Sequence, residues 1–303
     1  MNTILPNLII VGAAKCGTSS LHNYLEQHPQ VFMSKVKEPR FISSQFMPPL
    51  QGPGDHKVEK WYVKKFSDYK KLFENSDGYP VRGESSADTF YFYEKSIPVI
   101  KQYLGDPKII ILLRNPVKRS FSAYQHLVRD QRENLTFEEG LAHEDERIKN
   151  NWELIYHYKA VSLYAAGVKA FLENFKNVKV VLTEELEKNP QQTMADIFNF
   201  LNIETSFTIS SEIRYNVSGK PRSQWLHQFL FEGHPLRNLM RPVVRLFLSH
   251  ETRKRISLKV QEKNLVKMKL NSETRTMLKK YFQTDIEHVQ LLLKKDLSHW
   301  LND

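Results

Sequence analysis

The sequence has little of what marks membrane, secreted or metal-binding proteins. It contains one cysteine, Cys16, so no intrachain disulfide can form, and this usage is typical of a cytoplasmic protein. No apolar run approaches the roughly 20 residues that a membrane-spanning helix needs. The run LIIVGAA lacks a preceding basic segment, so we expect a first strand and not a signal peptide. Neither a C-x-x-C pair nor H-E-x-x-H occurs, so we expect no metal site.

Basic residues are in excess, with 44 Lys and Arg against 34 Asp and Glu and a net charge of +10. Such an excess favours anionic ligands but does not choose among nucleotides, polyanions, nucleic acid and membrane surfaces. A non-enzymatic binder of nucleic acid or polyanions is therefore one alternative. Zinc-finger spacings and RNP-type aromatic motifs are both missing, so we expect no nucleic-acid partner.

Apolar, β-branched runs alternate with amphipathic segments along the first two thirds of the chain. The expected strands are 7–11, 31–33, 80–86, 108–114 and 178–182, and the expected helices are 18–27, 66–74, 97–104, 116–130 and 190–203. The acidic segment after the last strand is expected to be a loop. This alternation predicts an α/β fold with a central parallel sheet flanked by helices, in the three-layer arrangement of P-loop NTPases.

The chain shows no repeat and no low-complexity linker, which predicts a single domain over residues 1–303. Residues 225–303 are expected to be helical and to cover the active site in part. Arg237, Arg241 and Arg245 form a basic stripe there, which fits a lid, a membrane-surface helix or a solvated face. We expect a combined lid and cover.

The stretch GAAKCGTSS follows the first expected strand and precedes a helix. Gly12 and Gly17 have the spacing of a phosphate-binding loop, but Thr18 follows Gly17 and the lysine, Lys15, lies inside the loop. Backbone N–H groups at a helix N-terminus attract anions. The alternative is a tight turn with a surface lysine, which the flanking strand and helix disfavour. The predicted anion-binding residues are Ala14, Lys15, Cys16, Gly17, Thr18, Ser19 and Ser20.

A second anion site is predicted after the strand 108–114. Arg114 ends this strand, Asn115 and Pro116 start a helix, and Ser122 lies two turns into it. An arginine and a hydroxyl in this arrangement can hold a phosphate, although an Arg114–carboxylate pair and a solvated Ser122 are the alternative. A magnesium-dependent kinase or NTPase needs an acidic strand end, and Arg114 argues against that alternative.

The two elements together resemble the sulfotransferases that use 3′-phosphoadenosine 5′-phosphosulfate (PAPS), most closely the heparan-sulfate and bacterial branch. The segments KEPRF, GESSADTF, YNVSGKPRS and YFQTDIEHVQLLLKKDLSHW are similar to family blocks in family order. The resemblance implies PAPS as co-substrate without a metal, and adenosine 3′,5′-bisphosphate as product. The acceptor would be a hydroxyl, less readily an amine, of a small molecule or saccharide. The sequence is compatible with a homodimer.

The resemblance also implies roles for single residues. Lys15 would stabilise the leaving oxygen, and Glu38 would be the base, with His126 as the alternative base or a helix-surface residue. Arg114 and Ser122 would hold the 3′-phosphate, helped by a late loop with Ser218, Gly219, Lys220 and Arg222. Ser85 stands where heparan-sulfate enzymes have a lysine, which argues against a heparan-like acceptor.

Overall fold

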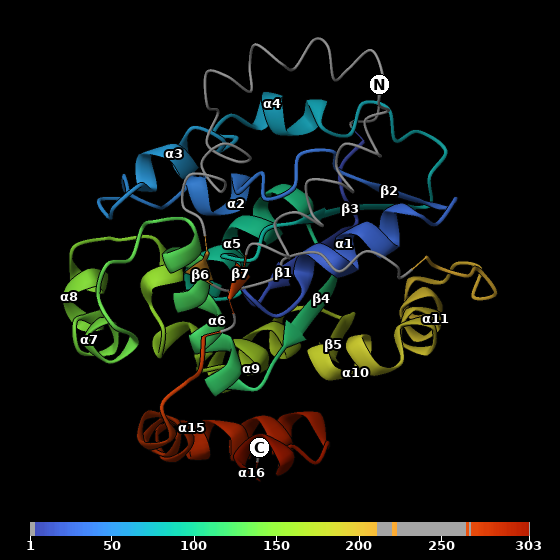
Figure 1. The fold of residues 1–303 in the computed structure, drawn as a ribbon. Coiled ribbons are helices and arrows are strands. Elements are labelled where there is room, and N and C mark those ends of the chain that lie inside the picture. The colour runs from blue at the N-terminus through green and yellow to red at the C-terminus, as the bar shows by residue number, and fades with distance from the viewer. Residues whose placement is uncertain (1–3, 211–219, 223–264, 267, 303) are drawn as a thin grey trace.

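The computed structural model describes residues 4–210, 220–222, 265–266 and 268–302. Within these ranges, a five-stranded parallel sheet has the order β2-β3-β1-β4-β5 (Figure 1). A separate antiparallel pair joins β6 and β7. The strands are β1 (Leu8–Gly12), β2 (Val31–Met33), β3 (Val81–Ser85), β4 (Lys108–Leu113), β5 (Val178–Leu182), β6 (Lys220–Pro221) and β7 (Leu265–Val266).

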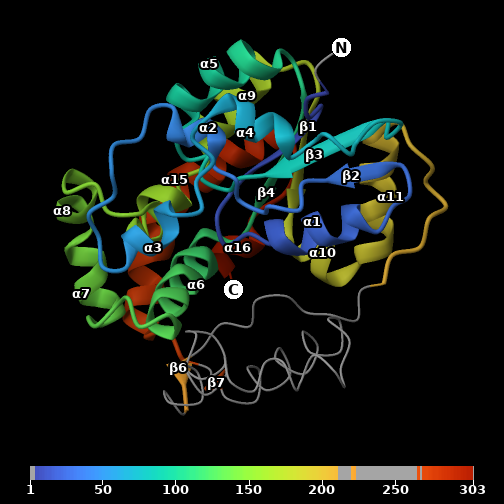
Figure 2. The ribbon, with the colours of Figure 1, turned by 90° about the horizontal axis from the view of Figure 1, so that it is seen from above.

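Helices cover both faces of the large sheet. Helix α1 lies on one face, and α5 and α9 lie on the other (Figure 2). This confirms the predicted α/β arrangement of three layers. The helices are α1 (Thr18–Glu26), α2 (Phe41–Ser44), α3 (Asp55–Glu59), α4 (Phe66–Lys71), α5 (Tyr93–Leu104), α6 (Pro116–Arg129), α7 (Phe137–Ala142), α8 (Glu144–Lys149), α9 (Ala165–Asn174), α10 (Thr183–Lys188), α11 (Pro190–Leu201), α15 (Ser272–Leu293) and α16 (His299–Asn302), with 3₁₀ turns η1 (Leu154–Tyr156) and η2 (Ala160–Ser162).

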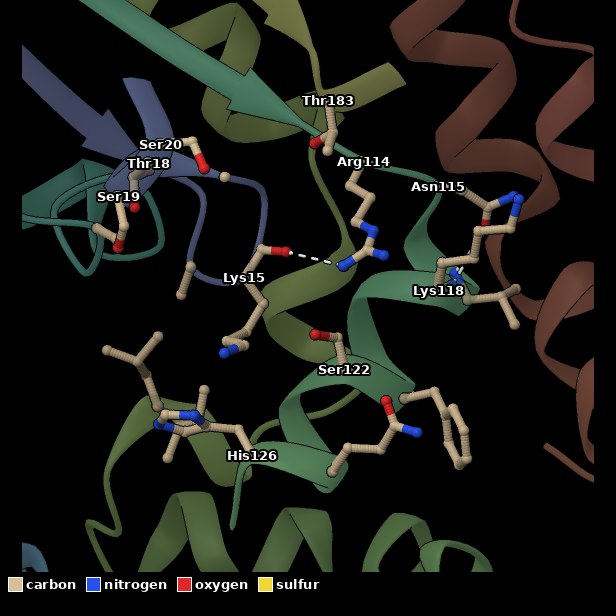
Figure 3. Close-up of a pocket in the computed structure, with 18 of the residues that line it drawn as sticks. Lys15, Thr18, Ser19, Ser20, Arg114, Asn115, Lys118, Ser122, His126 and Thr183 are labelled. Carbon is tan, nitrogen blue, oxygen red and sulfur yellow. Dashed lines mark hydrogen bonds between the residues drawn. The ribbon is translucent and has the colours of Figure 1, made fainter. Parts of the chain in front are cut away.

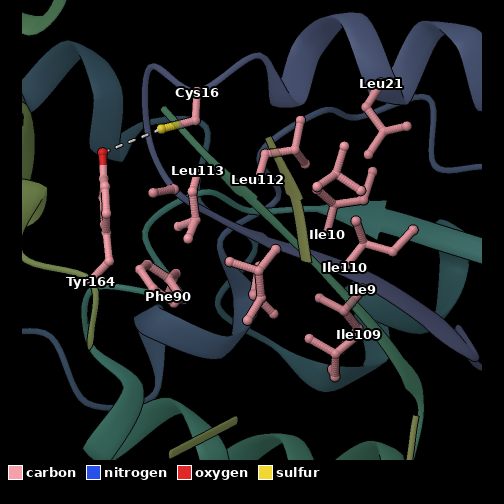
Figure 4. Packing of buried hydrophobic residues seen from close by; sticks show 14 of the residues in the cluster. Ile9, Ile10, Cys16, Leu21, Phe90, Ile109, Ile110, Leu112, Leu113 and Tyr164 are labelled. Atoms are coloured by element: carbon pink, nitrogen blue, oxygen red, sulfur yellow. Dashed lines mark hydrogen bonds between the residues drawn. The ribbon is translucent and has the colours of Figure 1, made fainter. Parts of the chain in front are cut away.

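The two central strands explain why this sequence forms a parallel sheet. Every residue of β1 is buried, and Ile109–Leu113 of β4 have no exposed surface. Strands buried on both faces are nearly continuous apolar runs, because helices cover each side. Ile10 pairs with Ile110, and both pack into the core between the layers (Figure 4). The pairing brings the carboxyl ends of β1 and β4 to the same edge of the sheet.

Two local predictions about helices are wrong. The acidic segment after β5 is helix α10 and not a loop; Glu185 accepts a hydrogen bond from the Leu182 backbone at 2.9 Å, and acidic residues in the first turn favour a helix. The pair Asn189–Pro190 predicts an N-cap like that of Asn115, but the Asn189 side chain does not cap α11. Asn115 caps α6 as predicted, accepting from the backbones of Val117 and Lys118 at 3.0 and 3.2 Å.

The described C-terminal helices pack onto the sheet domain beside α9 and α6 (Figure 1). Asp285 of α15 accepts from the backbones of Tyr164 and Ala165, at the start of α9, at 2.7 and 3.0 Å. Asn115 donates to the Trp300 carbonyl of α16 at 2.9 Å. The basic stripe of Arg237, Arg241 and Arg245 lies outside the described residues. Within the described ranges, no helix is long and apolar enough to cross a membrane.

Candidate active site

The loops after β1 and β4 form one wall of a cavity of about 830 Å³. Open α/β sheets bind ligands outside the carboxyl ends of their strands, where the connections from neighbouring strands diverge. Helix α6 and the segment after β2 form other walls, and Met268–Leu270 and Arg275 contribute from the C-terminal part. Its polar and charged lining residues include Lys15, Thr18, Ser19, Ser20, Lys37, Glu38, Arg40, Asp88, Arg114, Asn115, Lys118, Ser122, Gln125, His126 and Thr183.

The carbonyl groups of the glycine loop are held by side chains from elsewhere in the fold. Arg119 Nε donates to the Ala14 carbonyl at 3.0 Å, and Thr183 Oγ1 donates to the Cys16 carbonyl at 2.7 Å. Arg114 Nη1 donates to the Lys15 carbonyl at 3.4 Å, as Figure 3 shows. The backbone N–H groups of Lys15 and Gly17 have no partner among the described residues. The loop therefore has unused donors for an anion, as the sequence predicts.

Several residues of the cavity wall have left-handed backbone conformations. Lys15 has φ 70°, Glu38 has φ 59° and Arg40 has φ 51°. Side chains other than glycine and asparagine adopt this region at a cost of about 1–3 kcal/mol, and such residues cluster at functional sites. The two residues predicted to carry out catalysis are thus both held in uncommon backbone conformations.

Lys15 points from the loop into the cavity, toward the same space as Ser122 (Figure 3). Burial lowers the pKa of Lys15 to about 7, with Arg129, Arg114 and Arg119 acting in the same direction and Asp130 opposing them. Without a bound anion, burial and the neighbouring cations therefore disfavour the protonated, positively charged form of Lys15. An anion bound beside Lys15 would restore its charge.

Arg114 and Ser122 line one wall of the cavity, on β4's carboxyl end and on α6. Ser122 is buried, and its hydroxyl faces the cavity (Figure 3). Arg114 donates to the Lys15 carbonyl through Nη1, and among the described residues its other nitrogens have no partner and are available to a ligand. The predicted juxtaposition of these two groups is therefore present.

Glu38 lies in the same cavity, between two cations. Its carboxylate contacts Lys37 Nζ at 2.8 Å and Arg40 Nε at 3.7 Å, and accepts from the Ala87 backbone at 2.9 Å. Burial by itself would raise the pKa of Glu38, but Lys37, Arg40 and the Ala87 N–H outweigh it and lower the pKa. Glu38 is therefore an ionised carboxylate near neutral pH, the form that a base requires.

His126 lies on α6 and lines the cavity, where its side chain is half-buried. Arg129 Nη2 lies 2.7 Å from His126 Nδ1, and because arginine only donates, Nδ1 is the acceptor. His126 Nε2 lies 3.3 Å from Asp130 and carries the remaining proton. Burial, with Lys15 and Arg129, holds the pKa of His126 well below its usual range. Both ring nitrogens are occupied, which disfavours His126 as the base.

The Cys16 side chain does not face the cavity, although the sequence places it in the anion loop. It is buried in the core, with Sγ 3.8 Å from the Tyr164 hydroxyl (Figure 4). Only the backbone of Cys16 is available to the loop. Arg222 is exposed and is not among the described lining residues. Ser218, Gly219 and the side chain of Lys220 lie outside the described residues.

The sequence reasoning missed three residues that shape this site. Arg119 and Thr183 hold loop carbonyls, and Arg40 contacts both Glu38 and Glu153. Thr183 directly follows β5, so the rule that strand ends meet at one edge could have identified it. Arg119 carries no comparable signal. Within the described ranges, no cluster of three His, Cys, Asp or Glu side chains could share a metal ion, and metal independence stays a prediction.

Comparison with known proteins agrees with this geometry. The model of the sulfotransferase family matches residues 6–207. A crystal structure of a sulfotransferase from Alicyclobacillus acidocaldarius is 34% identical, with a TM-score of 0.77, and the match covers 98% of this chain and 99% of that one.

Two curated relatives are longer proteins. The membrane-associated sulfotransferase kil1 of Dictyostelium discoideum is 29% identical over 69% of this chain and 40% of its own. The human bifunctional heparan sulfate N-deacetylase/N-sulfotransferase 2 is 25% identical over 95% of this chain and 32% of its own. The chain thus spans less than half the length of either relative. The family match covers the sheet, the anion loop, Glu38, Arg114 and Ser122. The chain belongs to the sulfotransferase family.

Proposed function

We propose that the protein transfers the sulfuryl group of PAPS to a hydroxyl, less readily an amine, of a small-molecule or saccharide acceptor. The observation that carries this proposal is that one cavity joins the anion loop, the Arg114–Ser122 pair and Glu38. The loop donors and Thr18–Ser20 suit the 5′-phosphosulfate, and Arg114 with Ser122 suits the 3′-phosphate. Lys220, Arg222, Ser218 and Gly219 stay proposed ligands of that phosphate.

In the proposed reaction the acceptor oxygen attacks sulfur as the bond from sulfur to the phosphate oxygen breaks. Glu38 takes the acceptor's proton, and the bridging oxygen leaves with the electron pair as adenosine 3′,5′-bisphosphate forms. Lys15 places its positive charge at that oxygen, where negative charge is larger in the transition state than in the substrate. Each residue thus has one role, set by its place on the cavity wall.

The cations nearest Glu38 are already paired with groups of the protein. Lys37 contacts Glu38 at 2.8 Å, and Arg40 contacts Glu153 at 3.0 Å and the Tyr62 hydroxyl at 2.7 Å. Leu154 and Ile155 add apolar wall beside them. These described residues offer an acceptor no free positive charge. We therefore propose an uncharged acceptor with an apolar face, in line with Ser85 in place of the heparan-branch lysine.

Binding of adenosine 3′,5′-bisphosphate tests the donor proposal most directly. We expect calorimetry to show tight binding that magnesium does not change, because the cationic loop and Arg114 supply the charge compensation. ATP with magnesium should bind more weakly, since it lacks the 3′-phosphate. Magnesium-dependent preference for ATP would favour a P-loop kinase, the rival with the same architecture, and would contradict the proposal.

The acceptor proposal predicts a preference for uncharged substrates. With labelled PAPS, we expect kcat/KM for a neutral oligosaccharide or phenol to exceed that for a matched sulfated compound by about 10-fold or more, because Lys37 and Arg40 are already paired with Glu38 and Glu153 and leave an added sulfate without a counter-charge near the base. A preference for the sulfated compound would overturn the acceptor class while leaving the donor proposal intact. The single domain over residues 1–303, the cytoplasmic location and the homodimer stay predictions.

A further inference from the structure

Arg119 is a buried cation directly behind the anion loop. It lies on α6, has no exposed surface, and reaches the loop through the hydrogen bond from Nε to the Ala14 carbonyl at 3.0 Å. Its Nη1 donates to the carbonyls of His157 and Tyr158 at 3.2 and 3.3 Å, and to Ser162 Oγ at 3.3 Å. Its Nη2 is buried and has no partner among the described residues. All of its described partners are uncharged.

No carboxylate of the described chain neutralises this guanidinium by direct contact. Glu144 is the acidic side chain that acts on it electrostatically, but the carboxylate of Glu144 accepts from the backbones of Lys159 and Ala160, each at 2.7 Å. Buried arginines are usually paired, because an isolated buried charge is costly. Arg147 illustrates the usual case, with Glu133 at 2.7 Å. Arg119, which is hydrogen-bonded to the loop, thus has no carboxylate of the described chain in direct contact to compensate its positive charge.

We propose that Arg119 is a positioning residue of the anion loop, whose unpaired charge draws the 5′-phosphate end of the nucleotide into the loop without touching it. This rests on the proposed function, since the bound anion is what compensates the charge. The hydrogen bond to Ala14 also turns that carbonyl away from the anion. In the empty protein the same charge destabilises the fold.

A purely structural arginine would behave differently, and this separates the two roles. If Arg119 served only to hold the fold together, replacing it would lower both stability and nucleotide affinity. If its charge serves the ligand, a neutral replacement that keeps a donor would weaken nucleotide binding while the empty protein stays as stable or becomes more stable. Strained or uncompensated groups retained for function show this opposition between stability and activity.

The test compares Arg119→Gln, which keeps a hydrogen-bond donor without charge, with Arg119→Lys, which keeps the charge. We expect calorimetry to show adenosine 3′,5′-bisphosphate binding about 10- to 100-fold more weakly to Arg119→Gln, the range for losing a charge-assisted interaction, and within about 10-fold of the native affinity for Arg119→Lys. The melting temperature of empty Arg119→Gln should equal or exceed that of the native protein. Equal affinities of the two variants would overturn the proposal, as would failure of Arg119→Gln to fold.

A second comparison locates the effect at the 5′ end. Arg119→Gln should lose affinity for adenosine 5′-monophosphate by the same factor as for the bisphosphate. Ser122→Ala, placed at the 3′-phosphate, should lose affinity for the bisphosphate only. A loss in Arg119→Gln confined to the bisphosphate would contradict an action through the loop. If the native protein bound neither nucleotide, the proposed function itself would fail, which is a different result from a failure of the Arg119 proposal.

Discussion

Replacing Lys15 by alanine is expected to lower turnover by about 10³-fold or more, because removal of one donor at a developing oxyanion already costs about 10²–10³-fold and Lys15 carries a full charge as well. Lys15 is the loop residue whose side chain enters the cavity toward Ser122 (Figure 3). Steady-state assays with labelled PAPS measure the loss, and calorimetry measures bisphosphate affinity in parallel. A variant that kept native turnover would contradict the assignment of the loop.

Lys15→Arg is the matched control, and it yields a pH signature. Burial and the neighbouring arginines lower the pKa of Lys15 to about 7, so its positive charge in the empty enzyme is full below that pH and is lost above it. The value of kcat/KM for PAPS reports the free enzyme and should therefore fall as the pH rises through about 7. Arginine stays protonated, so Lys15→Arg should lose this basic limb even if its turnover is reduced. If the fall of kcat/KM with rising pH persists in Lys15→Arg, a group other than Lys15 causes it.

The parts of the fold and site that the sequence predicts are those with a local or repeating signal. The runs of β1 and β4 indicate buried strands because each is apolar throughout, and the glycine spacing around Lys15 needs only neighbouring residues. The cap at Asn115 is equally local. Once the sheet is parallel, the meeting of Lys15 and Arg114 at one edge follows from the strand order.

The contacts that complete the site depend on tertiary structure. In the sequence, Arg119 lies 105 positions from Ala14, and Thr183 lies 167 positions from Cys16, so no local sequence pattern predicts either hydrogen bond. The Cys16 side chain faces Tyr164 in the core, a contact between residues 148 positions apart. Arg129 and Asp130, at the end of the same helix, contact both ring nitrogens of His126 and so disfavour it as a base. Only the side-chain geometry reveals these contacts.

Glu38→Gln should lower turnover by about 10²–10⁴-fold, the contribution of a well-placed general base, while bisphosphate affinity stays nearly native. Glutamine keeps the size of the side chain and can still accept from the Ala87 backbone, which Glu38 contacts at 2.9 Å. The loss should therefore come from proton transfer and not from a collapsed wall. Single-turnover kinetics with saturating PAPS measure it.

His126→Gln is the comparison variant for this assignment, because both nitrogens of His126 are already engaged with Arg129 and Asp130. We expect it to lower turnover far less than Glu38→Gln. The Lys37 and Arg40 cations outweigh the burial that would raise the pKa of Glu38, so its base form persists as the pH falls and is lost only below the usual carboxyl range of about 4.3. We therefore expect turnover to fall with decreasing pH only below that range, and we expect this fall to be absent in Glu38→Gln. An acid limb that persists in Glu38→Gln and disappears in His126→Gln would transfer the role to the histidine.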